Sequence, residues 1–193
     1  MNLQARVRNI LVQPASEWSE IAAESTDVAG LYRNYILILA AIPAVCIFLG
    51  FAAFGAPVVG RLSAASALST AITTYVQTLV SVLIAALIIE KLAPTFGSHG
   101  NTVQALKLVG YAYTPVWLAG VFFLFWFLAA PAALIAGLYA IYLFYLGLTP
   151  VMKTPTDKVI PYMVVSALAL IVVSVLLRMV MTAMGAATYG GMF

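Results

Sequence analysis

The chain has 193 residues, of which 64% are hydrophobic and only 8% are charged, whereas ordinary soluble domains are roughly 25% charged. Nine basic and six acidic side chains cannot cover the surface of a water-soluble domain of this length. The composition therefore excludes a soluble globular protein and predicts a chain embedded in lipid. The net charge of +3 comes from basic residues scattered singly along the chain, so no nucleic-acid partner is expected.

Residues 1–33 form a polar N-terminal segment with an apolar stripe that has helical spacing. The stripe consists of Leu3, Val7, Ile10, Leu11, Trp18 and Ile21, with Pro14 between its two parts. This pattern predicts one or two short amphipathic helices at the cytoplasmic face. Two interpretations are equally open. Either the segment lies in the membrane interface with Trp18 as its anchor, or it docks against the helix bundle.

Long stretches without charge mark the membrane spans, because a charge at mid-bilayer costs roughly 2.5–3.5 kcal/mol on insertion scales. About 20 residues cross the hydrocarbon core, so the gap of 45 uncharged residues between Lys107 and Lys153 accommodates two helices. A turn near Leu128–Pro131 is expected to join them, with Pro131 in the first turn of the second helix. The pattern predicts an all-α polytopic bundle, with a transmembrane domain over 34–184 and a short external tail over 185–193. The five predicted spans are 35–54, 67–89, 103–127, 132–148 and 161–183.

The distribution of basic residues predicts the orientation of these spans. With five crossings, seven Lys and Arg side chains fall on the side of the N-terminus and two on the other side. The seven are Arg6, Arg8, Arg33, Lys91, Lys107, Lys153 and Lys158, and the two are Arg61 and Arg178. By the positive-inside rule, the N-terminus is expected in the cytoplasm and the C-terminus outside.

The second span carries a polar stripe with helical spacing, formed by Thr70, Thr74, Gln77, Thr78 and Ser81. Such a stripe is expected to face protein or water rather than lipid. It serves either as a set of hydrogen bonds between helices or as the lining of a substrate path. The first interpretation is favoured, because the stripe contains no ionisable group that would bind or relay an ion.

Two spans contain internal prolines, Pro43 and Pro115. Each removes one backbone hydrogen bond and frees the carbonyl four residues earlier, at Leu39 and Tyr111, so a kink is predicted at both places. Such breaks expose carbonyls to an ion or substrate in some transporters, but more often they only shape helix packing.

The fourth span has tyrosines at three-residue intervals, Tyr139, Tyr142 and Tyr145, and the small residues Ala133 and Gly137. The small pair would allow a neighbouring helix to approach closely. The tyrosine row fits either an aromatic belt at the interface or the polar edge of the bundle core.

No catalytic or metal-binding motif is recognisable in the chain. The single histidine, His99, has no Cys, Asp or Glu neighbours that would complete a metal site. The single cysteine, Cys46, lies in an apolar stretch, as a small buried hydrophobic residue would, and Arg178 is expected to extend to the headgroups. A catalytic group would have to assemble on the cytoplasmic face from Glu90, Lys91, His99, Lys107 and Asp157. No enzymatic activity, cofactor or metal is therefore expected.

Several motifs together resemble the Yip family, the Ypt/Rab-interacting membrane proteins. They are Pro14, Trp18, Ile21, Ala22 and Glu24 before the first span, Ile42-Pro43 within it, Gly110-Tyr111-Ala112-Tyr113-Thr114-Pro115 in the third span, and Tyr142-Leu143-Phe144-Tyr145-Leu146-Gly147-Leu148 in the fourth. The resemblance extends from about residue 3 to 180, and it marks Gly110, Tyr111, Thr114, Tyr142, Tyr145 and Gly147 as family-motif residues.

The resemblance implies five spans with a cytoplasmic N-terminus. Eukaryotic members act in vesicle traffic and bind prenylated Rab GTPases or each other. This chain lacks their long N-terminal region, and their Asp-Leu-Tyr-Gly-Pro motif is reduced to the fragment Gly30-Leu31-Tyr32. The short form suggests a multi-pass protein of the bacterial inner membrane, and a Rab-type partner is expected only if the source is eukaryotic.

Two function hypotheses follow. The first is a non-enzymatic, membrane-organising scaffold whose partners are the lipid bilayer, further copies of the chain or other membrane proteins. The second is a small transporter or channel that uses the polar stripe of the second span and the proline-kinked first and third spans.

Overall fold

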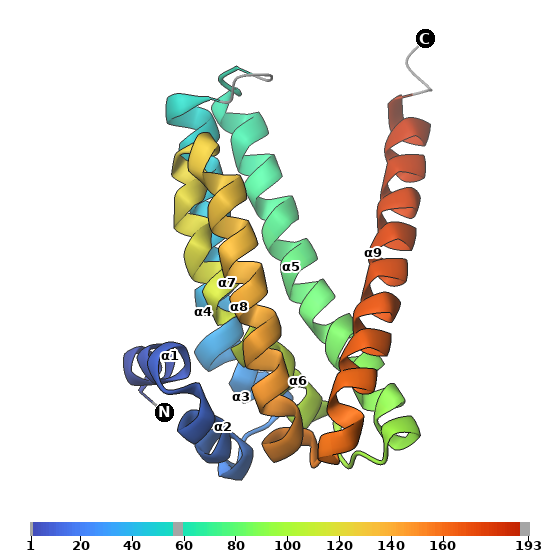
Figure 1. The fold of residues 1–193 in the computed structure, drawn as a ribbon. Coiled ribbons are helices and arrows are strands. Elements are labelled where there is room, and N and C mark those ends of the chain that lie inside the picture. The colour runs from blue at the N-terminus through green and yellow to red at the C-terminus, as the bar shows by residue number, and fades with distance from the viewer. Residues whose placement is uncertain (1, 56–59, 190–193) are drawn as a thin grey trace.

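The computed structural model describes residues 2–55 and 60–189, without the side chains of residues 126, 174, 176–178 and 180–189. Every regular element in this part of the chain is a helix, which confirms the all-α prediction (Figure 1). Five helical stretches are long and apolar enough to cross a membrane, as predicted. They are Val28–Phe54, Ala64–Phe96, Thr102–Leu124, Phe127–Met152 and Thr156–Val173.

The helices follow the chain in an up-and-down order. The elements are α1 (Leu3–Val12), α2 (Pro14–Ala23), α3 (Val28–Leu31), η1 (Tyr32–Ile36), α4 (Leu37–Leu49), η2 (Gly50–Phe54), α5 (Ala64–Leu92), η3 (Ala93–Phe96), α6 (Thr102–Ala112), α7 (Thr114–Ala119), η4 (Gly120–Leu124), α8 (Trp126–Met152), η5 (Thr156–Lys158) and α9 (Val159–Tyr189). Elements α3 to η2 form the first span, and α6 to η4 form the third.

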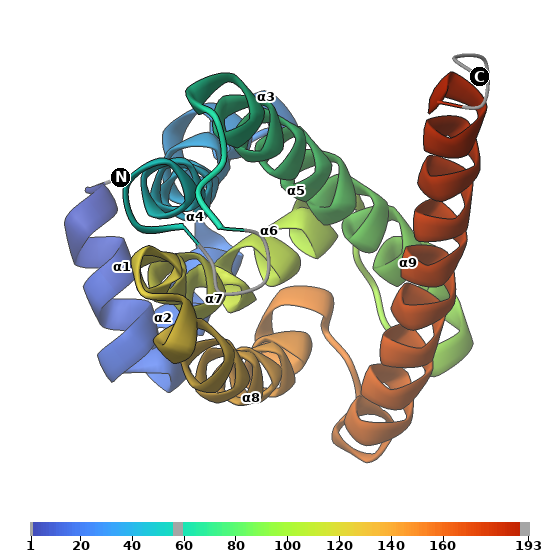
Figure 2. The ribbon, with the colours of Figure 1, turned by 90° about the horizontal axis from the view of Figure 1, so that it is seen from above.

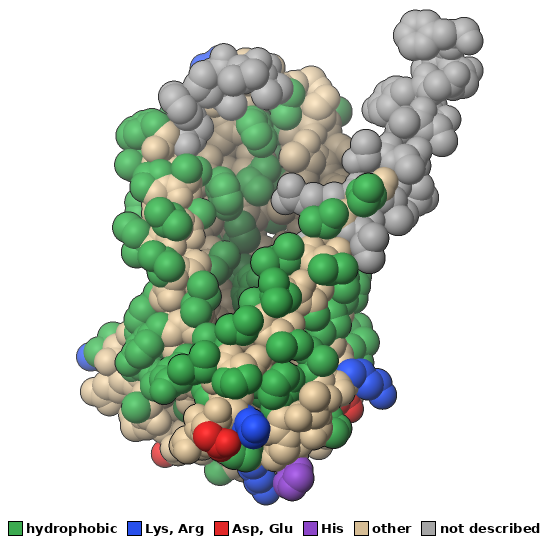
Figure 3. Space-filling view, turned by 45° about the vertical axis from the view of Figure 1, so that its right-hand side comes forward, with side chains coloured by type: hydrophobic (Ala, Val, Ile, Leu, Met, Phe, Trp, Pro, Cys, Tyr) green, Lys and Arg blue, Asp and Glu red, His purple; other side chains and the backbone are tan. Residues whose placement is uncertain are grey.

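The N-terminal helices α1 and α2 lie beside the spans at one end of the bundle, with α1 running across the direction of the spans (Figures 1 and 2). The Asn2 side chain caps α1 by accepting hydrogen bonds from the N–H groups of Gln4 and Ala5. Pro14 then opens α2 at a position where a helix needs no N–H donor. Charged side chains gather at this end of the molecule, hereafter the charged end (Figure 3).

The turn between the third and fourth spans differs from the prediction. It lies at Phe125, whose backbone is extended (φ −123°, ψ 93°), and not at Leu128–Pro131. The third span accordingly ends at Leu124 and not at 127, and Pro131 lies inside α8 instead of in its first turn. The chain turns back directly after η4, whose residues are Gly120, Val121, Phe122, Phe123 and Leu124. None of these is a polar residue that would mark a turn in the sequence.

The C-terminal helix is also longer than predicted. Helix α9 continues to Tyr189, so residues 185–189, assigned to an external tail, are helical. Alanine favours a helix, and this segment contains no proline that would end it. Residues 190–193 and the side chain of Arg178 lie outside the part that the structure describes.

The two predicted proline kinks have different outcomes. Helix α4 runs through Pro43 without interruption, so a kink there stays a prediction. The third span is broken at Tyr113, between α6 and α7, two residues before Pro115. Glycine brings the first and third spans together here, since a Cβ atom built on Gly120 would lie only 2.5 Å from the Cβ atom of Pro43.

Helix α9 joins the other spans mainly at the charged end. There the Tyr162 hydroxyl donates a hydrogen bond to the Ile89 carbonyl of α5, and its ring stacks on Phe96 with 4.9 Å between the centroids. Towards the other end, α9 diverges from α5 and α8 (Figures 1 and 2). The bundle is therefore tightly packed around α4, α6 and α7 and open along α9.

Candidate functional site

Buried polar and aromatic side chains collect where α1 and α2 meet the third and fourth spans. We call this group the docking cluster. Its members are Arg6, Glu17, Trp18, Glu24, Tyr35, Lys107, Tyr111, Thr114 and Gly147. Three of them, Tyr111, Thr114 and Gly147, are predicted family-motif residues. Trp18 and Glu24 belong to the motif before the first span.

Trp18 is the apolar centre of the docking cluster. It is fully buried, so its predicted role as an interfacial anchor is wrong and the alternative, docking against the bundle, is correct. Its ring meets Tyr111 edge to face, with 6.3 Å between the centroids. A Cβ atom built on Gly147 would lie 2.8 Å from the Trp18 ring, so only glycine leaves room for the indole on α8.

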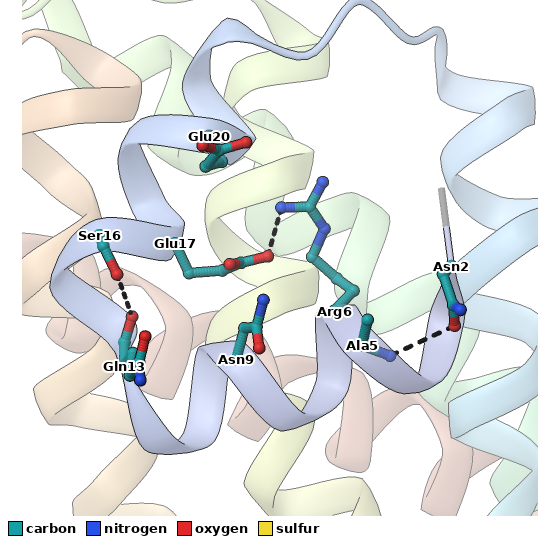
Figure 4. A pocket seen from close by; sticks show the side chains of 8 residues that line it. All are labelled: Asn2, Ala5, Arg6, Asn9, Gln13, Ser16, Glu17 and Glu20. Atoms are coloured by element: carbon teal, nitrogen blue, oxygen red, sulfur yellow. Dashed lines mark hydrogen bonds and ion pairs between the residues drawn. The ribbon is translucent and has the colours of Figure 1, made fainter.

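Arg6 of α1 is held by two carboxylates of the N-terminal segment. Its guanidinium donates to Glu17 Oε1 at 2.5 Å and to Glu24 Oε2 at 2.6 Å, and it lies 5.8 Å from the centroid of the Tyr111 ring (Figure 4 shows the Arg6–Glu17 pair). The side chains of Arg6 and Glu17 are only 12% and 9% exposed. This ionic contact fixes the angle between α1 and α2 and the position of both on the third span.

Lys107 of α6 binds the end of α2. Its buried ammonium donates to the carbonyl oxygens of Ile21 at 2.8 Å and Glu24 at 2.5 Å. The last carbonyls of a helix have no partner within the helix and carry partial negative charge, so a cation is favourable there. The sequence places Lys107 near the start of the predicted third span and on its cytoplasmic side, and it does not predict this contact with α2.

The end of α1 is satisfied in a similar way. The Tyr139 hydroxyl of α8 donates to the Leu11 carbonyl at 2.7 Å. Tyr139 is thus part of the protein interior, whereas Tyr142 and Tyr145 are 49% and 44% exposed on the outside of α8. The rings of Tyr139 and Tyr142 lie 5.8 Å apart, centroid to centroid, and the two exposed tyrosines lie outside the docking cluster.

Within the third-span motif, a threonine hydroxyl replaces the backbone hydrogen bond that the proline removes. Pro115 leaves the Tyr111 carbonyl without its usual N–H donor, and the Thr114 hydroxyl donates to that carbonyl at 2.7 Å. Tyr35 of the first span lies 2.6 Å from the Thr114 hydroxyl, to which it donates since the threonine hydrogen is already engaged. The freed carbonyl is consequently occupied by protein. Gly110 makes only ordinary contact, 3.4 Å from an Ile36 side-chain atom to a Cβ atom built on it.

The polar stripe of α5 has no comparable set of contacts. Thr70, Gln77 and Ser81 are exposed and Thr74 and Thr78 half-buried. The hydroxyls of Thr70 and Thr78 donate to the carbonyls of Ser66 and Thr74 of their own helix, at 2.9 and 2.8 Å. Hydrogen bonds between the first span and α5 come instead from tyrosines: Tyr75 of α5 donates to the Leu37 carbonyl of α4, and Tyr32 of η1 donates to the Leu79 carbonyl of α5.

The polar residues of the charged end are used in separate contacts. Thr102 donates to Glu90 at 2.7 Å, and Lys107 is engaged by α2. The backbone N–H of His99 donates to the Met152 carbonyl, and the residue itself is exposed. Within the described residues, no group of three His, Cys, Asp or Glu side chains is close enough to hold a metal ion.

Several cavities lie along the described residues. A polar cleft of about 450 Å³ lies between α1 and α2, with Asn9, Gln13 and Glu20 among its lining residues (Figure 4). An apolar cavity of about 560 Å³ lies between α5, α6, α8 and α9. Ala133 and Gly137 line this second cavity. A Cβ atom built on Gly137 meets nothing within 4 Å, so the predicted close approach of another helix at this pair is absent.

The fold and the docking cluster define an integral membrane protein of five helical spans with a helix pair fixed to their charged end. The model of the Yip1 domain matches residues 8–178, and the chain belongs to this family, which confirms the resemblance seen in the motifs. It is 25% identical over 151 residues to the inner membrane protein YohC of Escherichia coli K12, covering 75% of this chain and 77% of that protein. YohC of the Escherichia coli strain CFT073 matches to the same extent. No solved structure matches the chain.

The Arg6 contacts predict how firmly the N-terminal helices are held. Arg6→Gln leaves Glu17 and Glu24 without their cation, and the loss of a single hydrogen bond between charged groups costs about 1.5–3 kcal/mol. We expect amide hydrogen exchange in α1 and α2 to accelerate roughly ten- to hundredfold, as measured by mass spectrometry in detergent. Arg8→Gln is the matched control, because Arg8 is exposed on the same helix and makes no ion pair with any described residue. Equal exchange in the two variants would contradict the role of Arg6.

Proposed function

We propose that this protein is a non-enzymatic scaffold of the inner membrane, on which the helix pair α1–α2 presents a fixed surface to another protein or to a second copy of the chain. The observation that carries the proposal is that buried polar contacts hold α1 and α2 in one position on the spans. A segment that merely lay on the membrane would not need Arg6 and Lys107 buried beneath it, because burying charges is favourable only where the contacts are complete.

The outward side of the helix pair suits contact with another protein. Its exposed residues are mostly uncharged and polar, among them Asn9, Gln13, Ser16 and Ser19, with Glu20 and Arg8 as charges of opposite sign. Such a mixed surface is typical of interfaces that form and dissociate. The polar cleft between α1 and α2 adds a concave feature to this surface (Figure 4).

The membrane location rests on the relatives and the composition. YohC is an inner membrane protein, and the five apolar helices of this chain need a bilayer. A bacterial inner membrane offers no Rab-type GTPase, so the partner we propose is another membrane protein or a further copy of the chain.

The scaffold proposal predicts a partner contact through α2. Crosslinking in native membranes followed by purification should recover a second copy or another membrane protein, joined through residues of α1 or α2. Glu20→Arg reverses an exposed charge on this surface, and we expect it to reduce the recovered partner about tenfold, because mismatched charges cost several kcal/mol. Asp157→Arg, exposed at the same end but on η5, is the matched control. A chain that stays monomeric and recovers nothing contradicts the proposal.

We further propose that the charged end faces the cytoplasm, because it carries seven of the nine basic residues. The test uses single cysteines in a Cys46→Ala background and a membrane-impermeant maleimide added to spheroplasts. Ala65→Cys, exposed at the start of α5, should be labelled in intact spheroplasts. Thr95→Cys, exposed in η3 at the charged end, should be labelled only after lysis. The reverse pattern would show the opposite orientation.

A transporter is the second candidate, favoured by the break of the third span at Tyr113 beside the apolar cavity. If the polar stripe of α5 forms its path, Gln77→Leu and Thr74→Val should reduce flux of a transported solute into proteoliposomes at least tenfold. Ser69→Ala, an exposed α5 position outside the stripe, is the control. Flux that is unchanged in both stripe variants excludes this path.

A further inference from the structure

The apolar cavity beside α9 is a gap that the helices leave between them. Small residues from three neighbouring helices face it, including Ala85 of α5, Ala112 of α6 and Gly137 of α8. Helix α9 closes the other side only near the charged end, because it diverges from α8 further along (Figures 1 and 2). Figure 3 shows a hollow alongside α9 with mostly hydrophobic side chains around it. The cavity therefore opens sideways, towards the lipid.

Ser166 supplies a hydrogen-bonding group in this cavity. The residue is 1% exposed, it lines the cavity, and its hydroxyl has no hydrogen-bond partner in the described part of the chain. A serine inside a helix ordinarily donates to the carbonyl four residues earlier. A buried polar group without a partner costs about 1–3 kcal/mol, and no water is at hand in a bilayer to replace the partner. The orphaned hydroxyl thus points to a ligand atom that completes it.

The lining restricts the ligand that fits. None of the described residues around the cavity is charged, so an ion or a charged headgroup would be buried without a counter-charge. The walls are suited to hydrocarbon, with one site for an uncharged hydrogen-bonding group. At 1.5 Å per residue, Ser166 lies roughly 10 Å along α9 from Val159, which is near the depth at which the hydrocarbon core begins.

The size of the cavity argues against a helix of a second copy. An α-helix about 10 Å across occupies roughly 400 Å³ per turn, so a cavity of about 560 Å³ holds little more than one turn. A single flexible chain fills the same space without requiring α9 to move.

The geometry points to a lipid-binding site: the cavity holds one acyl chain of a bilayer phospholipid, and Ser166 donates a hydrogen bond to the ester carbonyl of that chain. The lipid enters sideways between α8 and α9, where Ile141 and Val164 are exposed. Bound lipid would then complete the contact between α9 and the other spans. This site is separate from the helix pair of the proposed scaffold surface, so each is tested independently.

The test is native mass spectrometry of the full chain, reconstituted in vesicles of phosphatidylethanolamine and phosphatidylglycerol and extracted in mild detergent. We expect the wild type to retain one phospholipid molecule after loosely attached lipid is removed. Gly137→Leu places a side chain in the open space beside Gly137 and should reduce the lipid-bound fraction at least tenfold. Ser166→Ala removes only the hydroxyl and should weaken retention about fivefold.

Ala130→Leu is the matched control for Gly137→Leu, because Ala130 is exposed on the same helix and does not line the cavity. It should retain lipid as the wild type does. Circular dichroism checks folding, and Ser166→Ala keeps the test decisive if Gly137→Leu does not fold. Equal retention in Ser166→Ala and wild type overturns the proposal. The proposal is also overturned if the wild type is a dimer without lipid and Gly137→Leu is a monomer, since a second copy of the chain would then occupy the cavity.

Discussion

The arrangement of the whole molecule depends on one contact, the buried ammonium of Lys107 on the last carbonyls of α2. A lysine in a membrane span is costly unless it finds acceptors, and the ends of helices are the places in a protein where carbonyls are left without donors. The third span supplies the donor that the last carbonyls of α2 lack, and α2 supplies the acceptors that the buried Lys107 ammonium requires. In the same way, the buried Arg6 guanidinium is paired with the Glu17 carboxylate, and the Tyr139 hydroxyl donates to a free carbonyl at the end of α1. The docking of α1 and α2 is thus a consequence of polar groups that would otherwise be unsatisfied.

The family motif is explained by the same requirement. Thr114 donates a hydrogen bond to the carbonyl that Pro115 releases, and Tyr35 donates to the Thr114 hydroxyl, so this chain of hydrogen bonds links the first span to the third. The glycines act sterically. Gly147 gives space to Trp18, and Gly120 lets the third span cross the first at Pro43. A motif with prolines and hydroxyls inside a membrane therefore need not line a path, because its polar atoms can all be used in holding helices together.

Much of this fold could be predicted from the sequence, because a bilayer imposes length and charge limits that are visible in any sequence. The five spans follow from those limits. The turn at Phe125 does not, since neither a charge nor a polar residue marks it within the 45 uncharged residues before Lys153. The site was predictable only in part. Tyr111, Thr114 and Gly147 belong to motifs, but the pair Arg6–Glu17 joins two separate helices without a sequence spacing that indicates it. Trp18 was ambiguous because an apolar stripe fits lipid and protein equally well.

The contrast between the two sides of the bundle bears on what the protein does. Around α4, α6 and α7 glycines bring the backbones close together and hydrogen bonds join the first span to the third, so this half has little freedom to change. Its buried Gln104 Oε1 and Trp117 Nε1 atoms have no partner among the described residues. Along α9 the described contacts with the core reach Leu170, Gly137 of α8 faces open space, and the Ser166 hydroxyl is unpaired among the described residues. Parts of a protein with few buried contacts are the ones that open most easily. A rigid half that fixes the N-terminal helices and an adaptable half in contact with lipid are what a scaffold needs if it couples the bilayer to a protein at its surface.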